Sequence, residues 1–426
     1  MNVATITPQQ HITYGLFKLR IIENETLVSI HRLVCDTPHT CGRVWREDMN
    51  CKTAIVYTDL FQQYNFGPTH PLTPIRLKLT FELMRRIGLL DSSNVQVHEP
   101  RQASRDELLL FHTEEYLQFV KRASERGSGS LDMGDTPVFK GCFEASALAA
   151  GASLTAVDLV MSGRVAYATN IAGGLHHAHP GRASGFCIFN DPAISIAYLK
   201  KKYSLNRILY LDVDAHHGDG VMYGFYSDPS VLDIDFHEDG RHLFPGTGST
   251  EEVGTGKAAG VKINVPLIPF TGDRAYLPLF REIVPAAVRK YKPQILLLQC
   301  GADSHANDLL AHLQLTTDTY REIAVIVRDL ANEVADGRLV VFGGGGYNPS
   351  NVARAWTVVT STLAEFVTPK ESPKDWQRLF EGVVGEKAPA LIESSGEARN
   401  EVYDVALNYG SEVLQDFKRR IQLLAS

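Results

Sequence analysis

The chain has 426 residues, of which 44% are hydrophobic and 21% are charged. This length suits one large α/β domain or two ordinary ones, and the composition excludes an intrinsically disordered chain. The formal net charge is -7 and no lysine- or arginine-rich block stands out, so we expect no direct nucleic-acid binding; no apolar run approaches a membrane span.

The first 48 residues are expected to be an amino-terminal extension or an incorrectly assigned start. They mix polar and apolar residues without a clear period, and Met49 directly precedes the first predicted strand. Their loop with Cys35, His39 and Cys41 could bind a metal, although the spacing is not a standard zinc pattern. The six cysteines form no Cys-x-x-Cys pair and follow no secretory signal, which indicates a reducing cytoplasm.

Strands and helices alternate along the rest of the chain. Strands are predicted over residues 52–57, 207–211, 231–236, 294–299 and 338–342. Helices are predicted over residues 72–89, 106–126, 141–161, 192–202, 317–335, 352–366 and 400–424, with a polar tail from about residue 370. This alternation predicts a parallel sheet covered by helices on both faces. We expect an extension (1–48), a catalytic domain (49–395) and a carboxyl-terminal helix (396–426).

The densest chemical signal follows the predicted strand 207–211. The stretch Asp212-Val-Asp214-Ala-His216-His217-Gly-Asp219 places three carboxylates and two imidazoles within eight residues. Residues two apart in an extended segment point the same way, so Asp214 and His216 could offer an oxygen and a nitrogen to one divalent cation. The alternative is a solvated acidic turn, which such a density of ligands after a buried strand disfavours.

Other predicted strands also end in functional-looking groups. Asp303 follows strand 294–299, and Gly343-Gly-Gly-Gly346-Tyr347 follows strand 338–342. Because ligands of α/β proteins bind at the carboxyl ends of the strands, Asp214, His216 and Asp303 would form a three-ligand zinc site. Three protein ligands leave a position open for water and substrate, and bound zinc lowers the pKa of water and polarises a carbonyl.

Two further groups could complete a hydrolytic site. The His176-His177 pair would supply a base for the water and an acid for the leaving group, with Asp212 and Asp219 as nearby orienting carboxylates. Tyr347 could donate to a developing oxyanion, since the glycines before it let backbone approach a ligand closely. Each signal is weak alone, because histidine pairs are often structural and the glycine run lacks the Lys-Ser/Thr of a phosphate loop.

These motifs resemble those of the zinc-dependent histone deacetylase family, and within it the prokaryotic acetoin-utilisation members. The resemblance extends from about residue 53 to 365 and rests on Gly173-Gly-Leu-His-His-Ala178, Ala183-Ser-Gly-Phe-Cys187, Asn190-Asp191, Asp212 to Gly220, Phe244-Pro-Gly-Thr-Gly248, Gly301-Ala-Asp303 and Gly343 to Tyr347. It implies a single-domain arginase/deacetylase α/β fold, with a central parallel sheet flanked by helices.

The resemblance also implies a role for each matched position. Asp214, His216 and Asp303 would bind Zn²⁺, with Fe²⁺ as the other candidate metal. His177, paired with Asp219, would be the general base and acid, and His176, paired with Asp212, would tune the charge beside it. Tyr347 would polarise the acetyl carbonyl. The implied substrate-binding residues are Asp135 at the rim, Phe186 and Phe244 as aromatic walls, Leu310 as an apolar wall, Gly174 and Gly345 along the channel, and Arg76 at an inner acetate cavity.

A structural K⁺ site is implied near Asp212, Asp214, His216 and Phe236. The chain departs from the family pattern here, because Asp235 replaces a serine that many relatives carry before the Phe-His pair. An additional carboxylate could strengthen or alter the cation site. The extension before Met49 is the second departure.

The predicted activity is hydrolysis of N6-acetyl-lysine in an acetylated protein, an acyl-CoA synthetase being one candidate substrate. Acetylpolyamine deacetylation is the nearest alternative, but a cationic polyamine would favour a carboxylate where the chain has Leu310. An arginase-like binuclear manganese hydrolase would need more carboxylates than His217-Gly218 and Ser304-His305 supply. A catalytically inactive acetyl-lysine-binding protein is disfavoured because every catalytic position is filled.

Overall fold

Eight parallel strands form one sheet at the centre of the described chain. The computed structural model describes residues 52–393 and 401–423, so the proposed extension and its Cys35, His39 and Cys41 loop lie outside the described residues. The strands are β1 (Thr53–Val56), β2 (Val95–His98), β3 (Tyr167–Asn170), β4 (Ile208–Asp212), β5 (Val231–Glu238), β6 (Lys262–Leu267), β7 (Ile295–Gln299) and β8 (Leu339–Phe342). Their order is β2-β1-β3-β8-β7-β4-β5-β6, which confirms the predicted parallel sheet.

The strand register brings the functional loops to one edge of the sheet. Asp212 of β4 pairs with Gln299 of β7, Gln299 pairs with Phe342 of β8, and Phe342 pairs with Asn170 of β3. Each of these residues is the last of its strand, and β4 and β7 are buried throughout. The loops after four neighbouring strands therefore start level with one another.

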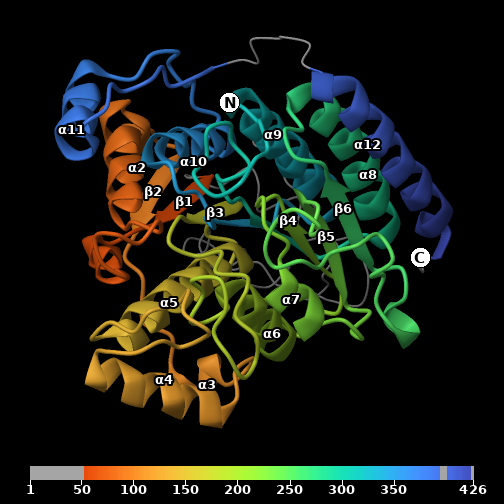
Figure 1. The fold of residues 1–426 in the computed structure, drawn as a ribbon, viewed down its shortest axis with the longest axis horizontal. Helices are drawn as coiled ribbons and strands as arrows, with labels where there is room; N and C mark the ends of the chain where they lie inside the picture. Colours follow the sequence, from red (N-terminus) through yellow and green to blue (C-terminus); the bar gives the residue numbers. More distant parts are fainter. Residues whose placement is uncertain (1–51, 394–400, 424–426) are drawn as a thin grey trace, which may run out of the picture. The chain divides into compact units, whose positions relative to one another are not determined.

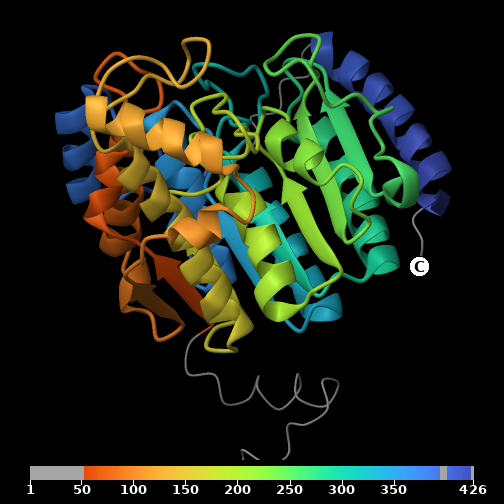
Figure 2. The same cartoon turned by 90° about the horizontal axis from the view of Figure 1, so that it is seen from below.

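Helices cover both faces of the sheet, as Figure 1 shows. One layer holds α2 (Ile75–Arg86), α8 (Asp273–Tyr291), α9 (Thr317–Val334) and α10 (Pro349–Leu363), with α11 (Lys374–Val384) packed on α2 and α12 (Glu401–Arg420) on α8. The other layer, in front of the strands in Figure 2, holds α3 (Arg105–Leu108), α4 (Glu114–Arg126), α5 (Cys142–Met161), α6 (Asp191–Tyr203) and α7 (Asp219–Gly224). Short 3₁₀ helices are η2 (Asp59–Gln63), η3 (Leu89–Asp91), η4 (Gly256–Ala258) and η5 (Ile421–Leu423).

Helix α5 corrects the expectation that no apolar run approaches a membrane span. By length and composition it is apolar enough to cross a membrane, but 78% of its apolar window is buried inside the protein. It packs against β1, β3 and α6, so its small apolar residues serve the core of the fold.

Two other expectations were wrong. The helix predicted over 106–126 is two helices, because Ser104 forms a capping box on α3 and Thr113 caps α4 separately. The segment predicted as a polar tail contains α11, whose Trp376 and Phe380 are buried against α2. Leu379 and Val384 of the same helix are partly buried against this cluster, so the segment carries an apolar face that docks the helix.

Candidate metal centre and active site

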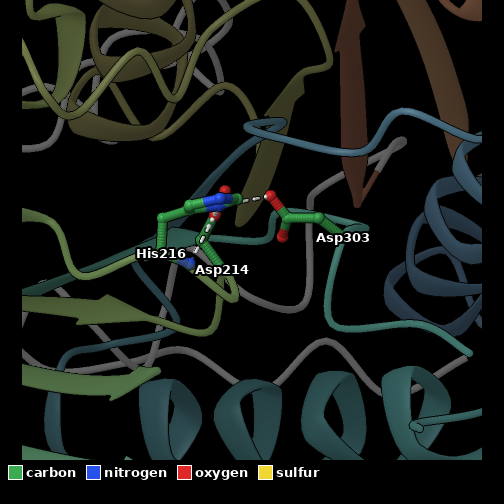
Figure 3. Close-up of side chains that lie close together, drawn as sticks. All are labelled: Asp214, His216 and Asp303. Carbon is green, nitrogen blue, oxygen red and sulfur yellow. Dashed lines mark hydrogen bonds and ion pairs between the residues drawn. The ribbon is translucent and has the colours of Figure 1, made fainter. Parts of the chain in front are cut away.

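Asp214, His216 and Asp303 meet beyond the carboxyl ends of β4 and β7. Their potential ligand atoms all lie within 4.8 Å of one another, and all three residues are buried. His216 Nδ1 lies 3.2 Å from Asp214 Oδ1 and 3.0 Å from Asp303 Oδ2 (Figure 3). The predicted ligand set is therefore brought together in space.

The backbone after β4 bends because its own carboxylates accept its amides. Asp212 Oδ1 accepts the N–H of Asp214 at 3.1 Å, and Asp214 Oδ1 accepts the N–H of His216 at 3.0 Å. An aspartate that accepts the amide two residues later forms a turn. Asp303 Oδ1 accepts the N–H of Ala215 at 2.8 Å, which fixes the β7 loop against this bend.

The charges of the three residues fit a bound cation. Burial disfavours the protonated His216 ring, but the hydrogen bonds and charges of Asp214 and Asp303 outweigh it and raise its pKa to about 10. Burial and the charge of Asp214 raise the pKa of Asp303 to about 8. Burial opposes the charged form of Asp214, but the positive charge of His176 and the hydrogen bond of His216 outweigh it and hold its pKa well below the usual value. The site therefore favours positive charge between its ligands, and a bound cation would supply that charge in place of the proton on His216. One imidazole nitrogen and two carboxylate oxygens suit zinc or another divalent transition metal.

His176 and His177 lie beside this centre, each on its own carboxylate. His176 Nδ1 lies 2.8 Å from Asp212 Oδ2, and His177 Nδ1 lies 2.7 Å from Asp219 Oδ1. The two Nε2 atoms lie 3.0 Å apart. Both predicted pairs are present in the structure.

The environment sets the two imidazoles to different charges. Burial opposes the charged form of His176, but the negative charges of Asp212 and Asp214 raise its pKa to about 10. Burial and the positive charge of His176 lower the pKa of His177 to about 4. Neutral His177 donates its Nδ1–H to Asp219, which leaves the ring's lone pair at Nε2, the atom that could act as a base.

Tyr347 lies beside His216 of the centre and is held there through its backbone. Its N–H donates to Asp308 Oδ2 at 2.8 Å, and its ring lies edge-on to Phe186 and His216, with centroids 5.8 and 6.1 Å away. Burial raises the pKa of the Tyr347 hydroxyl well above its usual value, so it remains a proton donor. Asp308 Oδ1 also accepts the N–H of Leu310, which ties the Leu310 loop to the tyrosine.

The two predicted aromatic walls contact different parts of the centre. Phe244 is 43% exposed and lies edge-on to His177, with ring centroids 5.0 Å apart. Phe186 adopts a positive φ of 67°, a strained conformation held by Tyr64, whose hydroxyl donates to Phe186 O at 2.7 Å. Asp135 is exposed. It lies near Phe186, since the Asp135 carbonyl and the Phe186 ring both contact His70.

The inner residues predicted from the resemblance also lie together. Arg76 is buried, donates to the carbonyls of Gly344 and Gly346 at 2.8 and 3.2 Å, and lies over the Trp356 ring. It lines a small cavity of about 20 Å³, room for about one water molecule. Gly174 is packed against the backbone of Gly343 and Gly344, where its φ of 87° requires glycine.

Asp235, the departure at the predicted cation site, already has two partners. Its Oδ1 lies 2.6 Å from His237 Nδ1, and its Oδ2 accepts the N–H of Gly218 at 2.7 Å. It pairs in register with Asp212. A K⁺ ion here stays a prediction.

Sequence reasoning missed two residues that support the centre. Gln299 donates to Asp214 Oδ2 at 2.8 Å, and Asp308 accepts from Tyr347 as described. The only feature of the sequence that could have pointed to Gln299 is its polar side chain at the end of an apolar strand. Asp308 had no such feature, because its partner is 39 residues away.

Three comparisons with known proteins agree with this geometry. A family profile for the histone deacetylase domain matches residues 70–363. The acetoin utilization protein AcuC of Bacillus subtilis is 42% identical over 332 residues, covering 76% of this chain and 85% of the relative, and AcuC of Staphylococcus aureus is 43% identical over 322 residues, covering 74% and 82%. The crystal structure of a histone deacetylase homologue from Aquifex aeolicus is similar with a TM-score of 0.74 and 31% identity, covering 86% of this chain and all of that one.

Proposed function

This chain belongs to the histone deacetylase family, with the arginase/deacetylase fold, and on that premise we propose that it is a zinc-dependent lysine deacetylase. Membership makes it a deacetylase similar to AcuC; the acetyl-lysine substrate, the metal and the mechanism are our proposal. The observation that carries it is the pairing of His177 with Asp219 beside the Asp214, His216 and Asp303 cluster.

Asp214, His216 and Asp303 would hold the metal, with Zn²⁺ the first choice and Fe²⁺ compatible with the same ligands. When bound, the metal supplies a Lewis acid for the amide carbonyl and lowers the pKa of water. We also propose a K⁺ ion near Asp212, Asp214, His216 and Phe236, where buried carboxylates accumulate.

The protein's own residues perform the proton transfers. His177 Nε2 takes a proton from the attacking water, and its Nδ1–H stays on Asp219. Tyr347 donates its hydroxyl to the oxyanion that forms from the acetyl carbonyl. Protonated His177 then passes its proton to the leaving lysine amine, which releases acetate and lysine. Phe186 and Phe244 would enclose the aliphatic stem of the lysine.

Leu310 favours acetyl-lysine over an acetylated polyamine. Its side chain is apolar and 36% exposed, on the loop that Asp308 ties to Tyr347. A protein substrate, an acyl-CoA synthetase for example, would present one acetyl-lysine, whereas a polyamine carries further positive charges that this wall does not neutralise. The described cysteines, Cys142, Cys187 and Cys300, are free and buried, which suits the reducing cytoplasm that we propose.

The test is acetate release from an acetyl-lysine peptide and from N-acetylspermidine and N-acetylputrescine in parallel. Each is assayed with zinc, with a chelator and with the Asp214→Ala variant. We expect release from the peptide that both the chelator and the substitution abolish. Preference for the polyamines would establish the alternative substrate, and no release from any of them would favour an acetyl-lysine-binding protein.

A further inference from the structure

His179 contacts the carboxylate on which the base rests. Its Nε2 lies 3.0 Å from Asp219 Oδ2, while His177 Nδ1 lies 2.7 Å from Asp219 Oδ1. Both oxygens of one buried carboxylate therefore face an imidazole. The Asp219 side chain is 7% exposed and that of His179 is 15% exposed.

The backbone around His179 is fixed independently of Asp219. His179 N–H donates to Arg182 O at 3.0 Å, which closes a short turn. His112 Nδ1 lies 3.1 Å from His179 O, and its Nε2 accepts the N–H of Asn190 at 3.0 Å, so His112 must donate from Nδ1. The N–H of Thr113, the cap of α4, donates to Pro180 O at 2.9 Å. His179 is thus presented to Asp219 by a turn that is hydrogen-bonded on both sides.

We propose that His179 is a positioning residue for catalysis. It holds the Asp219 carboxylate in the plane that orients His177, and it takes up part of the negative charge of Asp219. This inference rests on the proposed function, because it assigns His177 as the base. A carboxylate bound at one oxygen can rotate about its Cβ–Cγ bond, and a donor at the second oxygen prevents this. The same donor withdraws part of the charge that would otherwise strengthen the base.

The titratable groups facing His177 are His176, Asp219, His216 and Cys187, and Asp219 Oδ2 is contacted by His179. Burial opposes the charged form of Asp219, but the hydrogen bonds from His177 and His179 outweigh it and lower its pKa. Asp219 therefore stays ionised between the two rings. Within the described part of the chain, no hydrogen bond or ring contact joins His179 to Phe186, Phe244 or Tyr347.

The experiment compares His179→Leu, which removes the donor, with His179→Gln, which keeps an N–H donor. For His179→Leu we expect kcat to fall about tenfold with KM unchanged, the scale of outer-shell partners of catalytic groups. The acid limb of the kcat/KM profile should move to higher pH by about one unit, because Asp219 then acts on His177 alone. His179→Gln should restore both quantities most of the way.

A second readout does not depend on turnover. The Nδ1–H resonance of ¹⁵N-labelled His177 in the substrate-free protein should shift in His179→Leu but not in His179→Gln. The pH midpoint of the His177 titration should likewise rise only in His179→Leu. If His179→Leu does not fold, His179→Ala replaces it. Unchanged kcat, pH profile and His177 resonance in a folded variant would overturn the proposal. A shifted resonance in a protein that releases no acetate would retain the role of His179 and reject the proposed function instead.

Discussion

Gly345 passes so close to Asp303 that a side chain there would strike a proposed metal ligand. A Cβ built on Gly345 would lie 2.0 Å from Asp303 Oδ2, and the Gly345 N–H donates to Asp214 Oδ2 at 2.8 Å. One glycine therefore touches two of the three proposed ligands.

Gly345→Ala should displace Asp303 and weaken metal binding by about 10- to 100-fold, the usual scale for damage next to metal ligands. Zinc titration of the metal-free protein measures the affinity directly. The matched control is Gly382→Ala in α11, where nothing lies within 4 Å of the added Cβ and the helix should gain about 0.5–1 kcal/mol of stability. Equal zinc affinity in both variants would remove Asp303 from the ligand set.

Tyr347→Phe should lower kcat by about 10²–10³, the usual loss for a single oxyanion donor, while KM and the fold change little. The control is Tyr291→Phe at the end of α8, whose hydroxyl donates to Pro229 O at 3.0 Å, before β5 begins. That variant should lose only about 1 kcal/mol of stability and keep its kcat. Steady-state kinetics with the acetyl-lysine peptide decide this, and a near-normal kcat for Tyr347→Phe would end its assignment as a donor.

The sequence was sufficient to predict that the three proposed ligands meet, because the topology of a parallel sheet brings them to one edge. Asp214, His216 and Asp303 each follow a strongly apolar strand, and strands of one parallel sheet end at one edge. The pairing of His176 with Asp212 and of His177 with Asp219 came from the family resemblance. Spacing alone left the partners of the two histidines open.

Other parts of the fold left no readable pattern. Strand β3 has four residues, including Thr169 and Asn170, too few to show a period. Helix α8 contains Pro278 and Pro285, which ordinarily mark helix ends, so tertiary packing overrides the local signal. His179 and Asp308 act through partners far along the chain, and only three-dimensional proximity reveals such contacts.

The buried His112 should make the protein less stable as the pH falls. Burial lowers its pKa from 6.5 to about 4, so between these values the unfolded chain binds a proton that the folded ring does not. Stability is therefore complete above about pH 6.5 and declines toward pH 4, by at most about 3 kcal/mol for this ring. Urea unfolding from pH 4 to 7 should show a smaller decline for His112→Gln, whose amide can replace both hydrogen bonds. The exposed His242→Gln is the control, and an equal decline in all three proteins would show that His112 is not the group responsible.

Leu310 offers a direct test of substrate class. Leu310→Glu places a carboxylate on the loop that Asp308 ties to Tyr347, where it would attract the remaining ammonium groups of an acetylated polyamine. At a partly exposed position such an attraction is modest, so we expect the ratio of kcat/KM for N-acetylspermidine to that for the acetyl-lysine peptide to rise roughly tenfold. Val367→Glu adds the same charge at an 89% exposed position after α10, where the preceding residues contact Lys52 and Asn94 at the amino ends of β1 and β2, and should leave the ratio unchanged. An equal change in both variants would mean that overall charge, and not the Leu310 wall, selects the substrate.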